Sequence, residues 1–284
     1  MRVPDLLIKS IGFVAEVLGP DLSPGSLDPI ATTFLVSIPT KIHTGRFFYA
    51  ITARHVFSGT PDVKTVVIVN SKGGGVTELP ILGEWHHHPD PKVDVSATPV
   101  KYDPSMDVSA FDIEDCFDES HNPENIGLGD EVFFAGLFTP APGISRITPI
   151  VRHGNLAMLP CEQIQTAEGY ADVYLIEARS IGGISGSPVF VRETLALPVS
   201  RDGGEKCIMQ GIGKFKLLGI VQGHWDVDES MINQAYISHA RRGVNLGIAK
   251  VIPAKKIIET INGPGLRALR EEELRRFGTV GSLD

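Results

Sequence analysis

The chain has 284 residues, with 34 acidic and 26 basic side chains and a formal net charge of −8. An apolar content of 42% is enough to form a sizeable core, so a wholly disordered chain is excluded. The negative charge disfavours non-specific binding to nucleic acid or to anionic lipid, and no stretch approaches the roughly 20 apolar residues that cross a bilayer. Neither nucleic acid nor membrane is therefore expected among the partners of this protein.

The first residues and the cysteines bear on the compartment. The opening MRVPDLLIKSIGF lacks the long apolar core and small-residue cleavage site of a secretory signal, although a chain from which a signal had been removed would look the same. Cys116, Cys161 and Cys207 are few, odd in number and far apart, unlike a disulfide framework. We therefore expect a cytoplasmic protein in which each cysteine is a small buried hydrophobic side chain.

Most of the chain is predicted to form short strands. Apolar runs rich in β-branched and aromatic residues alternate with turns that contain Gly and Pro, a pattern typical of a sandwich or barrel rather than of βαβ units. The predicted strands are Ile11–Val17, Thr32–Ile38, Phe47–Thr52, Val63–Val69, Val93–Val100, Glu131–Ala135, Pro149–Val151, Val173–Glu177, Ser187–Val191, Leu217–Val221 and Leu246–Val251.

Helical patterns are concentrated at the C-terminal end. Pro253–Ile261 is predicted as a helix with an apolar face, which Asn262, Gly263 and Pro264 terminate. Leu266–Phe277 contains EEELRR and is predicted as a charged, solvated helix. In the middle of the chain, the acidic and polar segment Tyr102–Gly129 is interpreted as the link between two β-rich halves.

Three segments contain residues suited to acyl-transfer chemistry. YAITARHVF, at residues 49–57, presents His55 at the end of a predicted strand, and VDVSA, at residues 93–97, contains Asp94 between two valines. GGISGSPVF, at residues 182–190, presents Ser185 in a glycine-rich turn before a buried strand. A serine hydroxyl becomes a good nucleophile when an imidazole removes its proton, and a carboxylate orients and stabilises that imidazole. A glycine-rich turn can direct backbone N–H groups toward the developing oxyanion.

In their order along the chain, these motifs resemble those of the chymotrypsin-fold, or trypsin-like, serine peptidases. TARHV, the strand of Asp94 and GISGSP follow the order His, Asp, Ser of that family, and the resemblance extends from about Ile11 to Ile261. The resemblance implies an all-β fold of two six-stranded antiparallel β-barrels with a C-terminal helix. The expected division is residues 1–115 for the barrel with His and Asp, 116–252 for the barrel with Ser, and 253–284 for the helical segment.

The resemblance also implies the role of each residue. Ser185 would be the nucleophile, His55 the general base and then acid, and Asp94 the residue that orients His55. The N–H groups of Gly183 and Ser185 would form the oxyanion hole. The expected activity is that of a serine endopeptidase acting on a polypeptide substrate, with no cofactor and no metal.

Several aspartates near Asp94 in the sequence could also supply the carboxylate of the triad. Asp90, Asp103 and Asp107 lie close to Asp94 in sequence, but Asp94 is preferred because its valine neighbours suit a half-buried carboxylate at a strand start. The neighbouring run at residues 86–88 consists of three histidines. Adjacent histidines cannot all point the same way, and no acidic or Cys partner has ligand spacing, so this run is interpreted as a solvated loop rather than a metal site.

The sequence departs from the family at the residue before the nucleophile. Members activated by cleavage of a pro-segment have Asp there, whereas this chain has Ile184, as in the bacterial-type members. By position, Arg179 would lie at the base of the primary specificity pocket and His224 on its wall, which would favour an acidic residue before the scissile bond. In the alternative interpretation, the loop has a different length and Arg179 points to solvent.

Other functions compete with that of an active peptidase. One alternative is a catalytically silent fold that acts as a binding or scaffold module, although His55, Asp94 and Ser185 are all present. Another is a peptidase gated by a regulatory protein partner, with the acidic linker or the EEELRR helix as the docking surface. An α/β-hydrolase esterase is disfavoured, because that fold needs the order Ser, Asp, His and a helix after the serine, whereas Pro188 and a strand follow here.

Overall fold

The computed structural model describes residues 3–19, 26–40, 45–58, 64–117, 125–143, 145–166, 169–178, 183–200, 206–227 and 244–280. After a short helix, α1 (Asp5–Lys9), the N-terminal half forms one sheet in the order β5-β4-β1-β2-β3-β7-β6, and β8 pairs with β2 in parallel. Its strands are β1 (Ile11–Val17), β2 (Leu27–Pro39), β3 (Arg46–Thr52), β4 (Thr65–Asn70), β5 (Val76–Glu78), β6 (His86–His87), β7 (Ser96–Pro99) and β8 (Phe111–Asp112).

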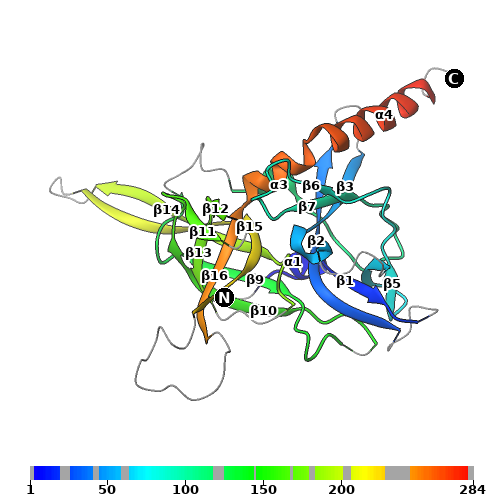
Figure 1. Cartoon of the computed structure of the whole chain (residues 1–284). Helices are drawn as coiled ribbons and strands as arrows, with labels where there is room; N and C mark the ends of the chain where they lie inside the picture. The colour runs from blue at the N-terminus through cyan, green and yellow to red at the C-terminus, as the bar shows by residue number, and fades with distance from the viewer. Residues whose placement is uncertain are drawn as a thin grey trace, which may run out of the picture.

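The C-terminal half forms a closed barrel of six strands in the order β10-β13-β16-β15-β14-β9, with a separate hairpin of β11 and β12 (Figure 1). Its strands are β9 (Glu131–Gly136), β10 (Ile150–Met158), β11 (Ile164–Thr166), β12 (Gly169–Ala171), β13 (Tyr174–Glu177), β14 (Pro188–Ser200), β15 (Lys206–Val227) and β16 (Val244–Pro253). Two 3-10 turns, η1 (Arg54–Phe57) and η2 (Ile113–Asp115), lie in the first half.

The predicted all-β class is confirmed, with one difference in each half. The first half is an eight-stranded sheet with one parallel pair, whereas the resemblance implies six antiparallel strands. β5, β6 and β8 have only two or three residues each, too few to be recognised from periodicity. In the second half, β14 and β15 extend well past the predicted segments, and their pairing continues to Ser200 and Lys206. The resulting hairpin projects from the barrel at the left of Figure 1.

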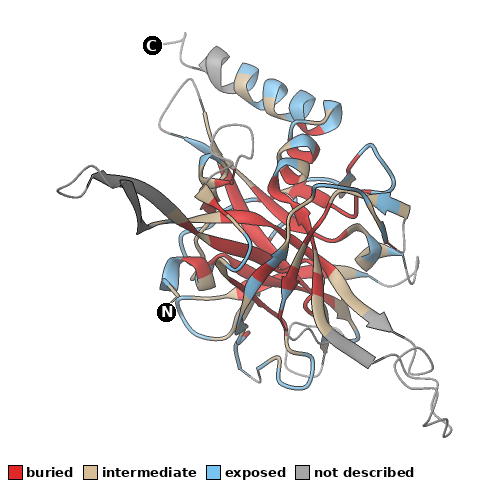
Figure 2. Cartoon of the chain, turned by 90° about the vertical axis from the view of Figure 1, so that its left-hand side faces the viewer, coloured by how far each residue is buried: buried red, intermediate tan, exposed pale blue. Residues whose placement is uncertain are grey.

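One hydrophobic core joins the two halves. Phe111 of the first sheet packs edge-on against Phe190 of the barrel, with ring centroids 5.3 Å apart, and Phe190 stacks on Phe133 at 5.1 Å. These rings belong to a buried cluster that also contains Phe34 and Ile51. Buried residues are accordingly concentrated in the centre of the molecule (Figure 2). The two halves therefore share a buried hydrophobic interface.

The described chain ends with two helices. α3 (Ala254–Ile261) buries Ala254, Ile257 and Ile261 in the same core, as its predicted apolar face requires. α4 (Pro264–Val280) projects away from the body and is mostly exposed (Figure 2). None of the described helices is long and apolar enough to cross a membrane.

The first turns of α4 differ from the predicted solvated helix, because they are docked on the first sheet. Leu266 is buried, and Arg270 donates hydrogen bonds to the Tyr49 hydroxyl at 3.0 Å and to the Ile261 carbonyl at 2.7 Å. Burial raises the pKa of the Tyr49 phenol, although the charge and hydrogen bond of Arg270 act in the opposite direction. Helix periodicity alone could not reveal this contact, because Tyr49 lies far away in the sequence.

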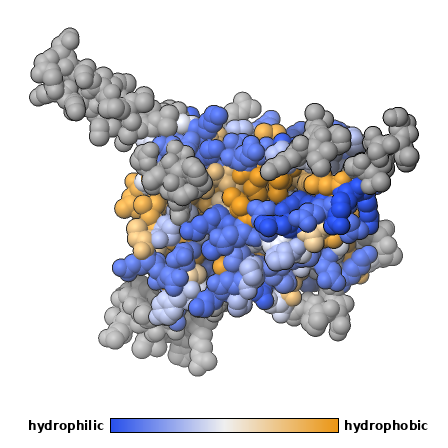
Figure 3. Space-filling view, turned by 90° about the horizontal axis from the view of Figure 1, so that it is seen from above, coloured by the Kyte–Doolittle hydropathy of each residue, from blue (hydrophilic) through white to orange (hydrophobic). Residues whose placement is uncertain are grey.

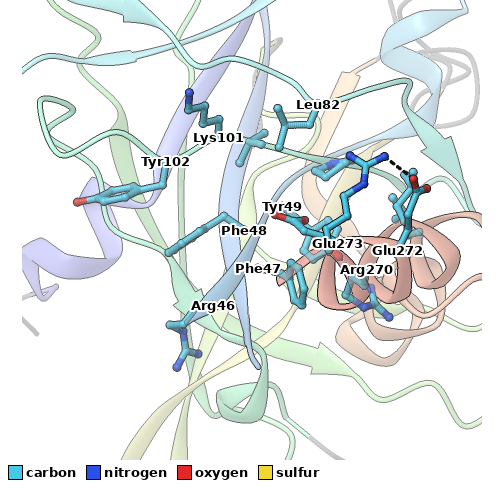
Figure 4. A pocket seen from close by; sticks show the side chains of 15 residues that line it. Arg46, Phe47, Phe48, Tyr49, Leu82, Lys101, Tyr102, Arg270, Glu272 and Glu273 are labelled. Atoms are coloured by element: carbon cyan, nitrogen blue, oxygen red, sulfur yellow. Dashed lines mark hydrogen bonds and ion pairs between the residues drawn. The ribbon is translucent and has the colours of Figure 1, made fainter. Parts of the chain in front are cut away.

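Beside this contact, a groove of about 640 Å³ is lined by residues of α4 and of the first sheet (Figure 4). Its lining combines the aromatic rings of Phe47, Phe48 and Tyr102 with charged residues of α4, among them Glu272 and Glu273. On the face seen from above, hydrophilic residues predominate among the coloured ones, and apolar residues lie in a band that reaches the left edge (Figure 3).

The cysteine prediction is correct for one residue and wrong for another. Cys116 is buried at the junction of the two halves, and burial raises the pKa of its thiol to about 12. Cys161, however, is exposed, because it lies in the bend between β10 and β11 rather than in a strand. The side chain of Cys207 lies outside the described residues.

The interpretation of the histidine run as a solvated loop is wrong for His88. His86 and His87 form β6, and His88 is 5% exposed. The Asp90 N–H donates to His88 Nδ1 at 3.1 Å, so His88 Nε2 is the nitrogen that donates to the Glu259 carboxylate of α3, at 2.9 Å. This buried histidine connects the loop before Asp94 to α3. Among the described residues, no group of three or more His, Cys, Asp or Glu side chains could hold a metal ion.

The Glu259 carboxylate should make stability depend on pH. Partial burial raises its pKa, but hydrogen bonds from Lys256 and His88 outweigh that effect, and the pKa is lowered from its ordinary 4.5. Its contribution is therefore present above pH 4.5 and lost as the pH falls through the lower folded-state pKa. Between pH 5 and pH 3 we expect the wild type to lose more Tm than Glu259→Gln. Glu271→Gln, on exposed α4, should follow the wild type, and equal slopes for all three proteins would contradict the prediction.

Candidate active site

The end of β3 and the start of β7 bring His55 and Asp94 together. The two strands are antiparallel, and Thr52 at the end of β3 pairs with Ser96 at the start of β7. His55 follows Thr52 in the 3-10 turn η1, and Asp94 precedes Ser96 by two residues. Strand pairing thus places residues that are 39 positions apart in sequence at one corner of the first sheet.

Both oxygens of the Asp94 carboxylate bond to His55. The His55 backbone N–H donates to Oδ1 at 2.8 Å, and the ring Nδ1 lies 2.5 Å from Oδ2. Because an ionised carboxylate only accepts, Nδ1 carries the proton in this contact and Nε2 is left as the basic ring nitrogen. The Asp94 side chain is 1% exposed, whereas that of His55 is 40% exposed.

The other carboxylates considered from the sequence bond to other groups. Asp90 Oδ1 accepts from the Lys92 N–H at 3.0 Å, and Asp103 accepts from Ser105, whose hydrogen bonds lower the pKa of Asp103. Asp107 forms an ion pair with Lys9 at 2.6 Å.

Ser185 lies in a tight turn that leads into β14. Gly183 and Gly186 have φ values of +94° and +84°, in the left-handed region that favours glycine. The Gly186 N–H donates to the Val221 carbonyl at 2.9 Å, and the Ser187 N–H donates back to the Ile184 carbonyl at 2.9 Å. Gly183 and Gly186 of the predicted glycine-rich turn are therefore required by its backbone, and Gly182 lies outside the described residues.

The Ser185 hydroxyl is directed toward β15, where it donates to the Gln222 carbonyl at 3.4 Å. His224 lies two residues further along β15 and pairs with Ala249 of β16. Arg179 lies outside the described residues, so a preference for acidic residues before the scissile bond stays a prediction.

Thr32, which was not among the site residues predicted from the sequence, connects the two halves at this site. Thr32 lies in β2 and is fully buried, and its backbone N–H donates to the Ser185 carbonyl at 3.0 Å. Its hydroxyl donates to the Gly183 carbonyl, also at 3.0 Å. The signal in the sequence was the pair Thr32-Thr33 inside an apolar strand, since a hydroxyl that is buried in a strand needs a partner.

Comparison with known proteins identifies the fold. No protein-family model and no curated protein matches the sequence. The MamO protease domain from Magnetospirillum magneticum, in its apo form, aligns with a TM-score of 0.51 and 15% identity over 89% of this chain and 96% of that chain. An inactive serine-to-alanine mutant of Rv3671c from M. tuberculosis H37Rv aligns with a TM-score of 0.45 and 17% identity, covering 90% of this chain and 87% of that chain. The similarity to the MamO domain confirms that this chain has the chymotrypsin-like fold.

Proposed function

We propose that this protein is a serine endopeptidase that hydrolyses peptide bonds through an acyl-enzyme on Ser185. The observation that carries the proposal is the buried Asp94 carboxylate, which binds both the backbone and the ring of His55. These two contacts hold the orientation of the His55 ring and place a carboxylate where it would stabilise an imidazolium, which is what a general base needs. The turn with left-handed Gly183 and Gly186 presents the nucleophile from the other half of the molecule.

The proposed reaction proceeds in two steps. His55 Nε2 accepts the Ser185 proton as Oγ attacks the scissile carbonyl, which requires the hydroxyl to turn from the Gln222 carbonyl toward His55. The N–H groups of Gly183 and Ser185 stabilise the oxyanion, and the imidazolium then donates its proton to the leaving amine. A water molecule, deprotonated by the same imidazole, hydrolyses the acyl-enzyme and regenerates Ser185.

The proposal is tested by labelling the purified protein with a fluorophosphonate and by measuring digestion of casein. Fluorophosphonates react with an activated serine and require no knowledge of the substrate. We expect stoichiometric labelling at Ser185 together with casein cleavage, and neither in Ser185→Ala. A folded protein that is labelled but leaves casein intact would be a serine hydrolase with another substrate. Absence of labelling would favour the silent or partner-gated alternative.

A further inference from the structure

We infer that Thr32 is a positioning residue that fixes the turn of Ser185 relative to His55. This inference rests on the proposed function, because it concerns the same site. Thr32 belongs to the N-terminal sheet, which also supplies His55 and Asp94, whereas the Ser185 turn belongs to the C-terminal barrel. The nucleophile and its base therefore come from different halves, and their relative position depends on the contacts between those halves.

The hydrogen-bonding capacity of the Thr32 hydroxyl is fully used. It donates to the Gly183 carbonyl at 3.0 Å and accepts from the Leu137 N–H at 2.8 Å and from the Ser187 hydroxyl at 3.2 Å. A hydroxyl offers one donor and two acceptor lone pairs, so these three contacts exhaust it. Two of the three contacts reach the turn on either side of Ser185, and the third reaches the barrel just after β9.

The backbone of Thr32 also forms hydrogen bonds with the Ser185 turn on one side and with the strand before His55 on the other. Its N–H donates to the carbonyl of Ser185 itself at 3.0 Å. Its carbonyl accepts from the Thr52 hydroxyl at 2.7 Å, and Thr52 ends the strand that leads into His55. A chain of short hydrogen bonds thus runs from the strand of the base, through Thr32, to the nucleophile. Thr52 and Ser187 are both fully buried, so water does not compete for these bonds.

Close packing around Thr32 leaves little freedom for an alternative arrangement. A Cβ on Gly136 would lie 2.0 Å from Ser187 Oγ and 2.6 Å from Thr32 Oγ1, so only glycine at this position allows the two hydroxyls to approach. The hydrogen bond to the Gly183 carbonyl also holds Gly183 at a φ of +94°, the conformation of the residue proposed to donate to the oxyanion. Removing the hydroxyl should loosen the oxyanion turn, although it leaves every proposed catalytic group chemically unchanged.

The test compares Thr32→Val with Thr33→Val. Thr33 is the next residue of β2, is equally buried, and donates its hydroxyl to the Ile51 carbonyl at 2.8 Å inside the first sheet, away from the Ser185 turn. Both variants remove one buried hydroxyl, and Thr32→Val should lower Tm further because it breaks three hydrogen bonds rather than one. Thr32→Val should slow fluorophosphonate labelling of Ser185 by about 10–100-fold, part of the loss caused by deleting one oxyanion donor. Thr33→Val should label at close to the wild-type rate.

Thr32→Ser tests whether the hydroxyl itself sets the labelling rate. This variant keeps the hydroxyl and should restore the rate of fluorophosphonate labelling. If the added methyl group of Thr32→Val prevents folding, Thr32→Ala takes its place. Equal slowing in the Thr32 and Thr33 variants, or no rescue by serine, would reduce Thr32 to a structural residue and overturn the inference. A wild type that is labelled while Thr32→Val keeps its rate overturns this inference alone. A wild type that is not labelled overturns the proposed function, and the inference with it.

Discussion

Replacing Asp94 by asparagine is expected to slow acylation of Ser185 by on the order of 10⁴-fold. The asparagine can keep the contact from the His55 backbone N–H to Oδ1, but its amide would donate to the ring where the carboxylate now accepts at 2.5 Å. The imidazole would then carry its proton on Nε2, in the tautomer that cannot remove the serine proton. The rate constant for fluorophosphonate labelling measures the loss, with Tm showing whether the fold persists.

Asp107→Asn is the matched control for this prediction. Asp107 was an alternative acid in the sequence, but its carboxylate bonds to Lys9 on the surface. Exposed ion pairs contribute little, so the labelling rate should stay within about twofold of wild type. If Asp107→Asn lost more of the labelling rate than Asp94→Asn, the assignment of Asp94 as the acid would be wrong and the triad would be a different one.

Gly186→Ala is expected to produce the largest loss of stability among these variants. The residue has a φ of +84°, where a side chain costs about 1–2 kcal/mol. A Cβ would also lie 2.1 Å from the Thr32 carbonyl oxygen and 2.5 Å from Thr52 Oγ1, and relief of such overpacking costs roughly 1–3 kcal/mol more. Because the clash separates the first sheet from the Ser185 turn, labelling of Ser185 should be lost as well. Urea unfolding measures the change in the free energy of unfolding.

Gly74→Ala separates the two contributions. Gly74 has a similar φ of +93°, but a Cβ there meets nothing within 4 Å. It should lose only the part of the free energy that arises from the left-handed backbone and should keep the wild-type labelling rate. If Gly74→Ala destabilises the protein as much as Gly186→Ala, close contact between the two halves is not what makes glycine necessary at residue 186.

The sequence was a good guide wherever a feature depends on neighbouring residues. β1 matches its predicted segment, Ile11–Val17, because its residues alternate between the two packed faces of a strand. α3 begins after Pro253 and ends before Asn262, as its flanking residues predict. Short strands such as β6 and β8 escaped prediction, because two residues carry no periodicity and form a strand only when a partner strand is adjacent.

Residue types and local spacing by themselves determined the all-β class, the three segments that contain His55, Asp94 and Ser185, and the glycines of the serine turn. Tertiary structure alone decided that both oxygens of Asp94 bond to His55, that His88 is buried against Glu259, and that Thr32 connects the two halves. The physical reason is the separation along the sequence of the residues that interact. Strand propensity and turn conformation are set by residues close in sequence, whereas a buried hydrogen bond needs a partner that only strand register and the packing of two halves can supply.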